Sequence, residues 1–190
     1  MGRIRQVKQG DISLLAWVQQ DNDTAYVVFD GTNFNLTDPV AVDGSLKFKR
    51  NVVTVDTDAA VTLSTSNSGT LYVLAKADGI TFTLPPAEAG LTYEFFVSVS
   101  CTSNNYGIDT DGTDNFEGVV LNVDKDQAYS SLTMLQAIGI ANGSPTHIDM
   151  DGSTTGGLIG SRIVVTAINA DRWMVEGILH GDTNVVTPFS

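Results

Sequence analysis

The sequence is poor in the side chains that build disulfides and transition-metal sites. Its 190 residues include one cysteine, Cys101, and two histidines, His147 and His180, which lie in separate turn-rich segments. One cysteine excludes an internal disulfide and a cysteine-based metal cluster, so Cys101 is predicted to be a small packed residue. No apolar run approaches the ~18 residues of a membrane helix. We therefore expect no metal, no cofactor and no membrane contact.

Aromatic residues are also scarce, at 8%. Sugar-binding faces need exposed aromatic rings, and four residues are candidates for such a face: Trp17, Tyr106, Phe116 and Phe189. We expect these rings to be buried or in contact with another subunit instead. A second set lies in long apolar runs and is predicted to form the core: Tyr93, Phe95, Phe96 and Trp173.

Catalytic motifs are missing. The sequence has no Gly-x-Ser-x-Gly elbow, no Walker-type Gly-Lys-Ser/Thr and no His-Glu-x-x-His. A hydrolytic site would need a pair of carboxylates, and nothing in the sequence pairs the available glutamates. We therefore interpret them as solvated acids: Glu88, Glu94, Glu117 and Glu176. We predict that the protein is not an enzyme.

The charge is unevenly distributed along the chain. Residues 1–50 hold six basic and six acidic side chains, whereas residues 51–190 hold four and sixteen and so carry the whole net charge of −12. Such a body repels a phosphate backbone, so no nucleic-acid partner is expected. The first ten residues hold Arg3, Arg5 and Lys8 and no acid. This basic end either docks on an acidic protein surface or keeps a frayed terminus soluble.

The chain reads mostly as short strands separated by Asp-Gly and Asn-Gly turns, which favour antiparallel pairing. We predict an all-β protein: an antiparallel β-sandwich or barrel-like (jelly-roll or tulip-type) domain with an irregular N-terminal arm. No repeat of 20–50 residues is evident, which argues against a solenoid. The predicted strands span residues 26–30, 52–56, 61–64, 71–76, 80–84, 93–101, 106–109, 119–123, 132–140, 159–168 and 172–179.

The domain prediction places an arm and loop at residues 1–45, in contact with another protein or another subunit, before an acidic antiparallel β-domain at 46–190. Two segments, 11–20 and 124–135, are predicted to form short helices, the first capped by Asp11.

Two acidic turns are candidates for a cation site. Alternating Asp109, Asp111 and Asp114, followed by Glu117, resemble a Ca²⁺ loop, but the spacing misses the EF-hand pattern. Because Asp-Gly is the commonest hairpin turn, a plain hairpin is the favoured interpretation. The same ambiguity applies to residues 149–152.

Three segments resemble virion proteins of tailed phages. Residues 79–95, GITFTLPPAEAGLTYEF, resemble a motif in which a strand ends in Leu-Pro, a small residue and glycine follow, and a Tyr-x-Phe strand returns. Residues 108–118 resemble the acidic Asp-Gly hairpin of the same proteins, and residues 170–177 resemble their closing strand, with a tryptophan after a polar turn. The order of the motifs is more informative than any one alone.

That resemblance implies a virion protein, either a head decoration (cement) protein or a fibre or spike domain. No coiled-coil or repetitive shaft is present, so we expect a decoration protein on the outer capsid that forms a homotrimer and stabilises the shell against packaged DNA. Its partner would be the major capsid protein; the alternative is a tail fibre or spike domain that binds a host glycan. The predicted docking residues are Arg3, Ile4, Arg5, Val7, Lys8, Ile12, Leu14, Leu15 and Trp17.

Overall fold

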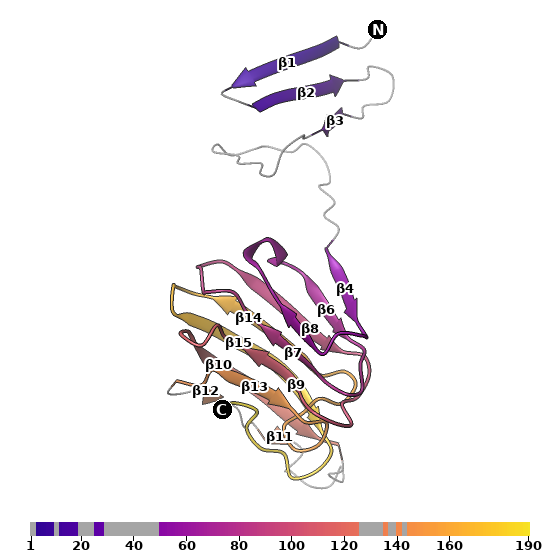
Figure 1. Cartoon of the computed structure of the whole chain (residues 1–190), viewed down its shortest axis with the longest axis vertical. Coiled ribbons are helices and arrows are strands. Elements are labelled where there is room, and N and C mark those ends of the chain that lie inside the picture. Colours follow the sequence, from indigo (N-terminus) through magenta and orange to yellow (C-terminus); the bar gives the residue numbers. More distant parts are fainter. Residues whose placement is uncertain are drawn as a thin grey trace. The chain divides into compact units, whose positions relative to one another are not determined.

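Figure 1 shows the computed structural model of the chain. The structure describes residues 3–9, 12–18, 25–28, 50–125, 135–136, 140–141 and 144–190; before residue 50 and between 135 and 141 it describes the backbone alone. The chain divides into two compact units, Met1–Phe48 and Lys49–Ser190. Each unit is described by itself below.

The N-terminal unit contains a three-stranded antiparallel sheet in the order β1 (Arg3–Gln9), β2 (Ile12–Val18) and β3 (Ala25–Val28). The prediction of an irregular arm with a helix at residues 11–20 is therefore wrong. The apolar spacing of Ile12–Val18 fits both structures, and pairing decides between them: all seven residues of β2 lie opposite β1 in one continuous register. The second predicted helix falls largely outside the described residues.

The body, Lys49–Ser190, is built from two sheets. Its strands are connected by turns and one short 3₁₀ turn, and its described residues include no α-helix, so the prediction of an all-β protein is confirmed. The large sheet has the order β11-β10-β15-β14-β8-β6-β4, with β12 also paired to β10, and the small sheet has the order β13-β9-β7-β5.

The bounds of the large-sheet strands are β4 Val52–Val55, β6 Leu71–Leu74, β8 Thr92–Val97, β10 Asn115–Asp124, β11 Leu135–Gln136, β12 Ile140–Ala141, β14 Arg162–Ala167 and β15 Arg172–Gly181. Those of the small sheet are β5 Ala60–Thr62, β7 Ile80–Thr83, β9 Tyr106–Asp109 and β13 His147–Met150. Across the described part of the chain, we find no helix with the length and hydropathy that a membrane crossing requires.

Strands β4 to β9 alternate between the two sheets, so the chain winds as a short coil. Strands β4, β6 and β8 pair in parallel in one sheet, and β5, β7 and β9 pair in parallel in the other. Val52 is aligned with Leu71 and Leu71 with Glu94, so successive turns of the coil take 19 and 23 residues. The purely antiparallel prediction is therefore wrong, because turns such as Asp78-Gly79 join strands of different sheets. Because the successive turns of the coil differ in amino-acid sequence, the coil leaves no visible repeat in the sequence.

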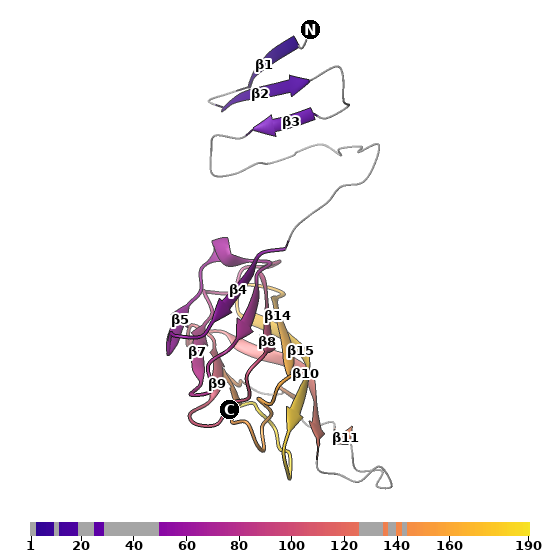
Figure 2. The same cartoon turned by 90° about the vertical axis from the view of Figure 1, so that its right-hand side faces the viewer.

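One hydrophobic core lies between the sheets, which Figure 2 shows as two layers. The ring of Phe82 on β7 packs 5.4 Å from Tyr72 and 5.0 Å from Phe95, both on the large sheet. The core prediction is confirmed for Tyr93, Phe95, Trp173 and Cys101. It is wrong for Phe96, which alternation turns to the opposite face of β8, where it is half-buried.

Candidate functional site

A charged cluster lies on the outer face of the large sheet, the face turned away from the small sheet. Tyr93 and Phe95 point into the core, so Glu94 between them points outward, and it is only 7% exposed. Arg162 of β14 donates from Nε to Glu94 Oε1 at 2.5 Å, and Nη1 of Arg50 donates to Oε2. One carboxylate therefore ties Arg50, two residues before β4, to β8 and β14.

The two arginines determine the ionisation of Glu94. Burial by itself raises the pKa of the carboxyl, but hydrogen bonds and charge from Arg162 and Arg50 outweigh it and hold the pKa below its usual range. In return, Glu94 raises the pKa of Arg162. Glu94 is therefore ionised at neutral pH. The prediction that Glu94 is a solvated acid is wrong, because its carboxylate is buried and forms ion pairs with both arginines.

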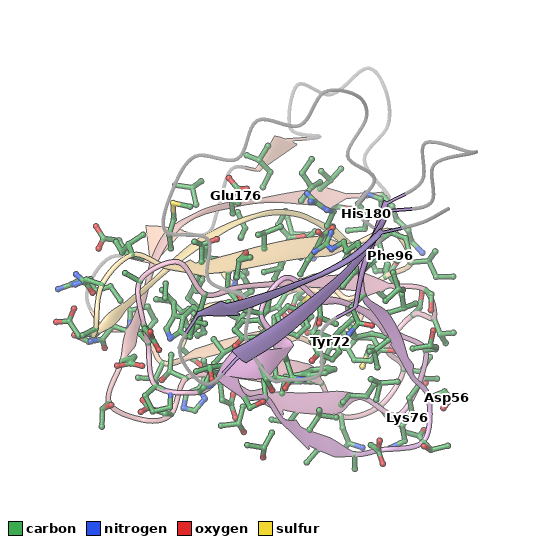
Figure 3. The ribbon with its side chains drawn as sticks, turned by 90° about the horizontal axis from the view of Figure 1, so that it is seen from above. Asp56, Tyr72, Lys76, Phe96, Glu176 and His180 are labelled. Carbon is green, nitrogen blue, oxygen red and sulfur yellow. The ribbon has the colours of Figure 1, made fainter. Side chains whose placement is uncertain are left out.

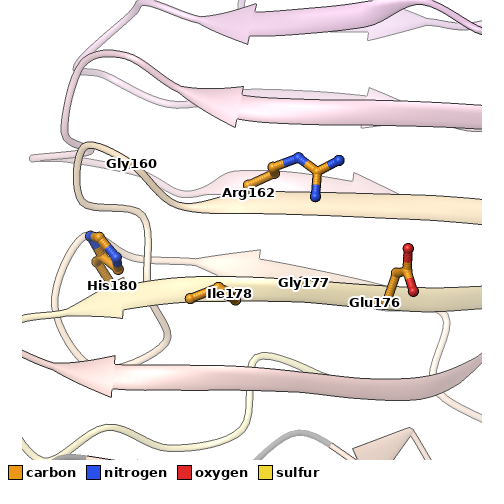
Figure 4. Close-up of a pocket in the computed structure, with 6 residues that line it drawn as sticks. All are labelled: Gly160, Arg162, Glu176, Gly177, Ile178 and His180. Atoms are coloured by element: carbon orange, nitrogen blue, oxygen red, sulfur yellow. The ribbon is translucent and has the colours of Figure 1, made fainter.

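Beside this cluster is a hollow of about 470 Å³ between β14 and β15 (Figure 4). Gly177 in its wall has to be glycine, because a Cβ there would lie 2.4 Å from the carbonyl oxygen of Arg162 on the paired strand β14. His180 places Nδ1 3.1 Å from the carbonyl oxygen of Ile159, which favours the proton on Nδ1. The lining residues supply a guanidinium, a carboxylate and an imidazole, which suit hydrogen bonding, and no hydroxyl or thiol. They are Gly160, Arg162, Glu176, Gly177, Ile178 and His180.

The predicted docking residues lie on two paired strands. In the register of β1 and β2, Ile4 is opposite Trp17 and Val7 is opposite Leu14. The basic residues of β1 face small partners, since Arg5 is opposite Ala16 and Lys8 is opposite Ser13. Ile12 is opposite Gln9, Leu15 is opposite Gln6, and Arg3 is opposite Val18. The backbone thus brings all nine residues into one hairpin.

The acidic loop at residues 109–114 connects the two sheets, because β9 belongs to the small sheet and β10 to the large one. The hairpin interpretation is therefore wrong. Asp111 Oδ1 accepts from the backbone N–H groups of Thr113 and Asp114 at 2.9 and 3.2 Å, and these bonds lower its pKa. Asp114 is buried and accepts the N–H of Ala87 at 2.7 Å. These oxygens close the loop on itself and on its neighbour.

The second acidic turn is closed in the same way. Asp151 Oδ1 accepts from the backbone N–H groups of Ser153 and Thr155 at 2.8 and 2.9 Å, and its Oδ2 accepts from the Thr154 hydroxyl at 2.8 Å. Burial by itself raises the pKa of Asp151, but these hydrogen bonds outweigh burial and hold the pKa below its usual range. Within the described residues, no group of three or more acidic, histidine or cysteine side chains is arranged to hold a metal ion.

The aromatic candidates for a sugar platform are mostly enclosed. Tyr106 and Phe116 are 0% exposed, which confirms the expectation of burial for these two. Phe189 packs at the edge of the core, and the side chain of Trp17 lies outside the described residues.

Sequence reasoning missed the cluster of Arg50, Glu94 and Arg162, whose arginines are 44 and 68 residues from Glu94. The one available signal was a glutamate within the apolar run of residues 93–97. Comparisons of the chain with protein-family models, with curated proteins and with solved structures give no match.

Proposed function

We propose that the chain is a non-enzymatic structural protein of a tailed-phage particle, a decoration (cement) protein on the outer surface of the shell. In this proposal its body is a β-sandwich, its partner is the major capsid protein, and three copies form a homotrimer. Packaged DNA pushes the shell outward, and a clamp that binds only the closed arrangement of capsid subunits stabilises that arrangement by mass action.

The observation that best supports this function is the distribution of charge between the two compact units. Unit Met1–Phe48 carries four basic and six acidic side chains, whereas Lys49–Ser190 carries six and sixteen. Within the first unit, β1 holds Arg3, Arg5 and Lys8 and no acid. A basic strand in its own unit is suited to contact an acidic partner surface while the acidic body stays clear of it.

The construction of the body supports a mechanical role. Its two sheets share one core, and both acidic turns are closed by hydrogen bonds to Asp111 and Asp151. A unit held together in this way resists deformation when a load is placed on it. Three weak contacts from one trimer would also act at a high effective concentration, so that the assembly binds firmly.

Cosedimentation with shells of the parent particle that lack the chain tests the proposal. The full chain should pellet with the shells and saturate, and Arg3→Glu with Arg5→Glu should abolish pelleting. Lys76→Glu with Lys125→Glu changes the net charge equally and should bind as the unchanged protein does. Full pelleting of the β1 variant, or none of the unchanged chain, would overturn the proposal.

The glycan-binding alternative is tested on the free protein. The hollow lined by Glu176 and His180 offers polar groups but no phenylalanine, tyrosine or tryptophan ring among its six lining residues, which favours the decoration role. Saturable binding of the free chain to host-surface glycan, together with no binding to shells, would support a fibre or spike domain instead.

A further inference from the structure

The outer face of the large sheet is unusually apolar. The strand registers align two rows of side chains across six strands, from β4 through β6, β8, β14 and β15 to β10. The first row is Val52, Leu71, Glu94, Val164, Glu176 and Val119, and the second is Thr54, Val73, Phe96, Arg162, Ile178 and Leu121. Two-thirds of these positions are apolar, as in a sheet covered on both faces.

The apolar side chains of this face are accessible. Val52, Val119 and Ile178 are 54%, 51% and 50% exposed, and Met174, one step further along β15, is 39% exposed. Figure 3 shows Phe96, Glu176 and His180 on the same side of the large sheet, away from Tyr72 in the core. Large apolar side chains gathered in an exposed state on one face of a sheet mark an interaction surface.

The charges on this face balance, unlike those elsewhere on the body. Its three arginines are matched by three glutamates, two of which are ion-paired there: Arg50, Arg162, Arg172, Glu94, Glu117 and Glu176. The other charged residues of 51–190 are thirteen acids and two lysines. Two bodies of this chain therefore repel one another in most orientations, and this face is where both signs are available for pairing.

The size of the face is adequate for a stable contact. Six strands at about 4.8 Å spacing make it roughly 24 Å wide, and strands of four to ten residues make it roughly 13 to 33 Å long. Its flat area is then on the order of 500–600 Å² before the relief of side chains is counted, comparable to the roughly 800 Å² per partner of a stable interface.

We infer that three copies of this chain assemble through the outer face of the large sheet, with the three faces turned toward a common three-fold axis. The apolar side chains of the two rows pack against the neighbouring copies. Glu94 and Glu117 keep their arginine partners, and the charge of Glu176 acts on Arg162. This inference takes the homotrimer from the proposed function and identifies the surface through which its subunits contact one another. The occupants of the face are other copies of this chain, because its charges of both signs can pair with the same charges of a neighbouring copy, whereas a partner surface of one sign would meet as many like charges as opposite ones.

Sedimentation velocity of the full chain in the absence of shells tests the inference. The unchanged protein should sediment at about three times the 20.2 kDa of one chain. Ile178→Asp with Val119→Asp should give monomers with an unchanged circular dichroism spectrum. Val53→Asp with Val186→Asp is the matched control, since Val53 is aligned with Tyr72 on the opposite face of the sheet and Val186 lies outside the strands. These side chains are 37% and 47% exposed, and the variant should keep the assembled mass.

Met174 provides a second measurement that needs no substitution. Its sulfur should be oxidised by peroxide more slowly in concentrated, assembled protein than in dilute protein, as read by peptide mass spectrometry. A monomeric unchanged chain, an Ile178/Val119 variant that keeps its assembled mass, or equal oxidation of Met174 at both concentrations in an oligomeric protein would overturn the inference. Monomeric variants that still bind shells would support this inference about the subunit contact and would contradict only the argument that the trimer binds shells through avidity.

Discussion

Gly118 on β10 shows how strongly a single residue is constrained by strand pairing. It has a φ of 148°, and a Cβ there would lie 2.0 Å from the carbonyl oxygen of Val175 on the parallel strand β15. Gly118→Ala should therefore lower the free energy of unfolding by roughly 3 kcal/mol in urea denaturation. Gly112→Ala is the control: its φ is 94° but nothing lies within 4 Å, so it should cost roughly 1 kcal/mol. Equal losses would contradict this explanation.

The pKa of Glu94 makes a second prediction at the residue scale. Because its pKa in the folded protein is lowered by Arg162 and Arg50, its stabilisation is present above the ordinary pKa of 4.5 and is lost as the pH falls through the lower, folded-state value. Glu94→Gln should reduce the free energy of unfolding by about 1–2 kcal/mol at pH 7, since both arginines remain half-exposed. The difference between variant and parent should shrink in urea titrations below pH 4. A constant difference down to pH 2 would show that ionisation is irrelevant.

The turns that connect strands lead to a prediction about cations. In the loop at residues 109–114, Asp111 and Asp114 already accept backbone N–H groups, and Asp109 Oδ1 lies 2.9 Å from His147 Nδ1. Ca²⁺ would have to displace these donors, so millimolar Ca²⁺ or a chelator should leave the melting temperature unchanged in differential scanning fluorimetry. A rise of several degrees that Asp111→Asn removes would show a cation site in this loop.

Most strand positions could be predicted from the sequence, whereas their partners could not. Alternation in Ile80–Thr83 and Arg162–Ala167 reports a half-buried strand directly. An Asp-Gly turn does not reveal whether the next strand joins the same sheet, and so the parallel coil was missed. Strand β13, His147–Met150, alternates in the same way but was missed, because residues 149–152 were interpreted as an acidic turn. The cluster at Glu94 depends on that unpredicted pairing and could not be predicted either.

For the whole molecule, the core indicates which part of the chain folds alone. Among the residues whose side chains the structure describes, the buried cluster runs from Val55 to Leu179, within the compact unit Lys49–Ser190. A chain that begins at Lys49 should therefore melt cooperatively within a few degrees of the full chain, as followed by circular dichroism. It should also lose shell binding, as should a chain that lacks residues 2–20 alone. If the 49–190 fragment failed to fold, the first 48 residues would belong to the same cooperative unit.

The coil of β4 to β9 has a consequence for how such a protein can change over evolutionary time. Both sheets end at the same turn of the coil, with β4 at the edge of one and β5 at the edge of the other. Insertion of one complete turn, between the 19 and 23 residues seen here, would add a strand to each sheet and leave every existing pair in register. Insertions of half that length would move apolar side chains into the wrong sheet. Homologous proteins with this coil should therefore differ in length by whole turns of the coil, in steps of about 20 residues.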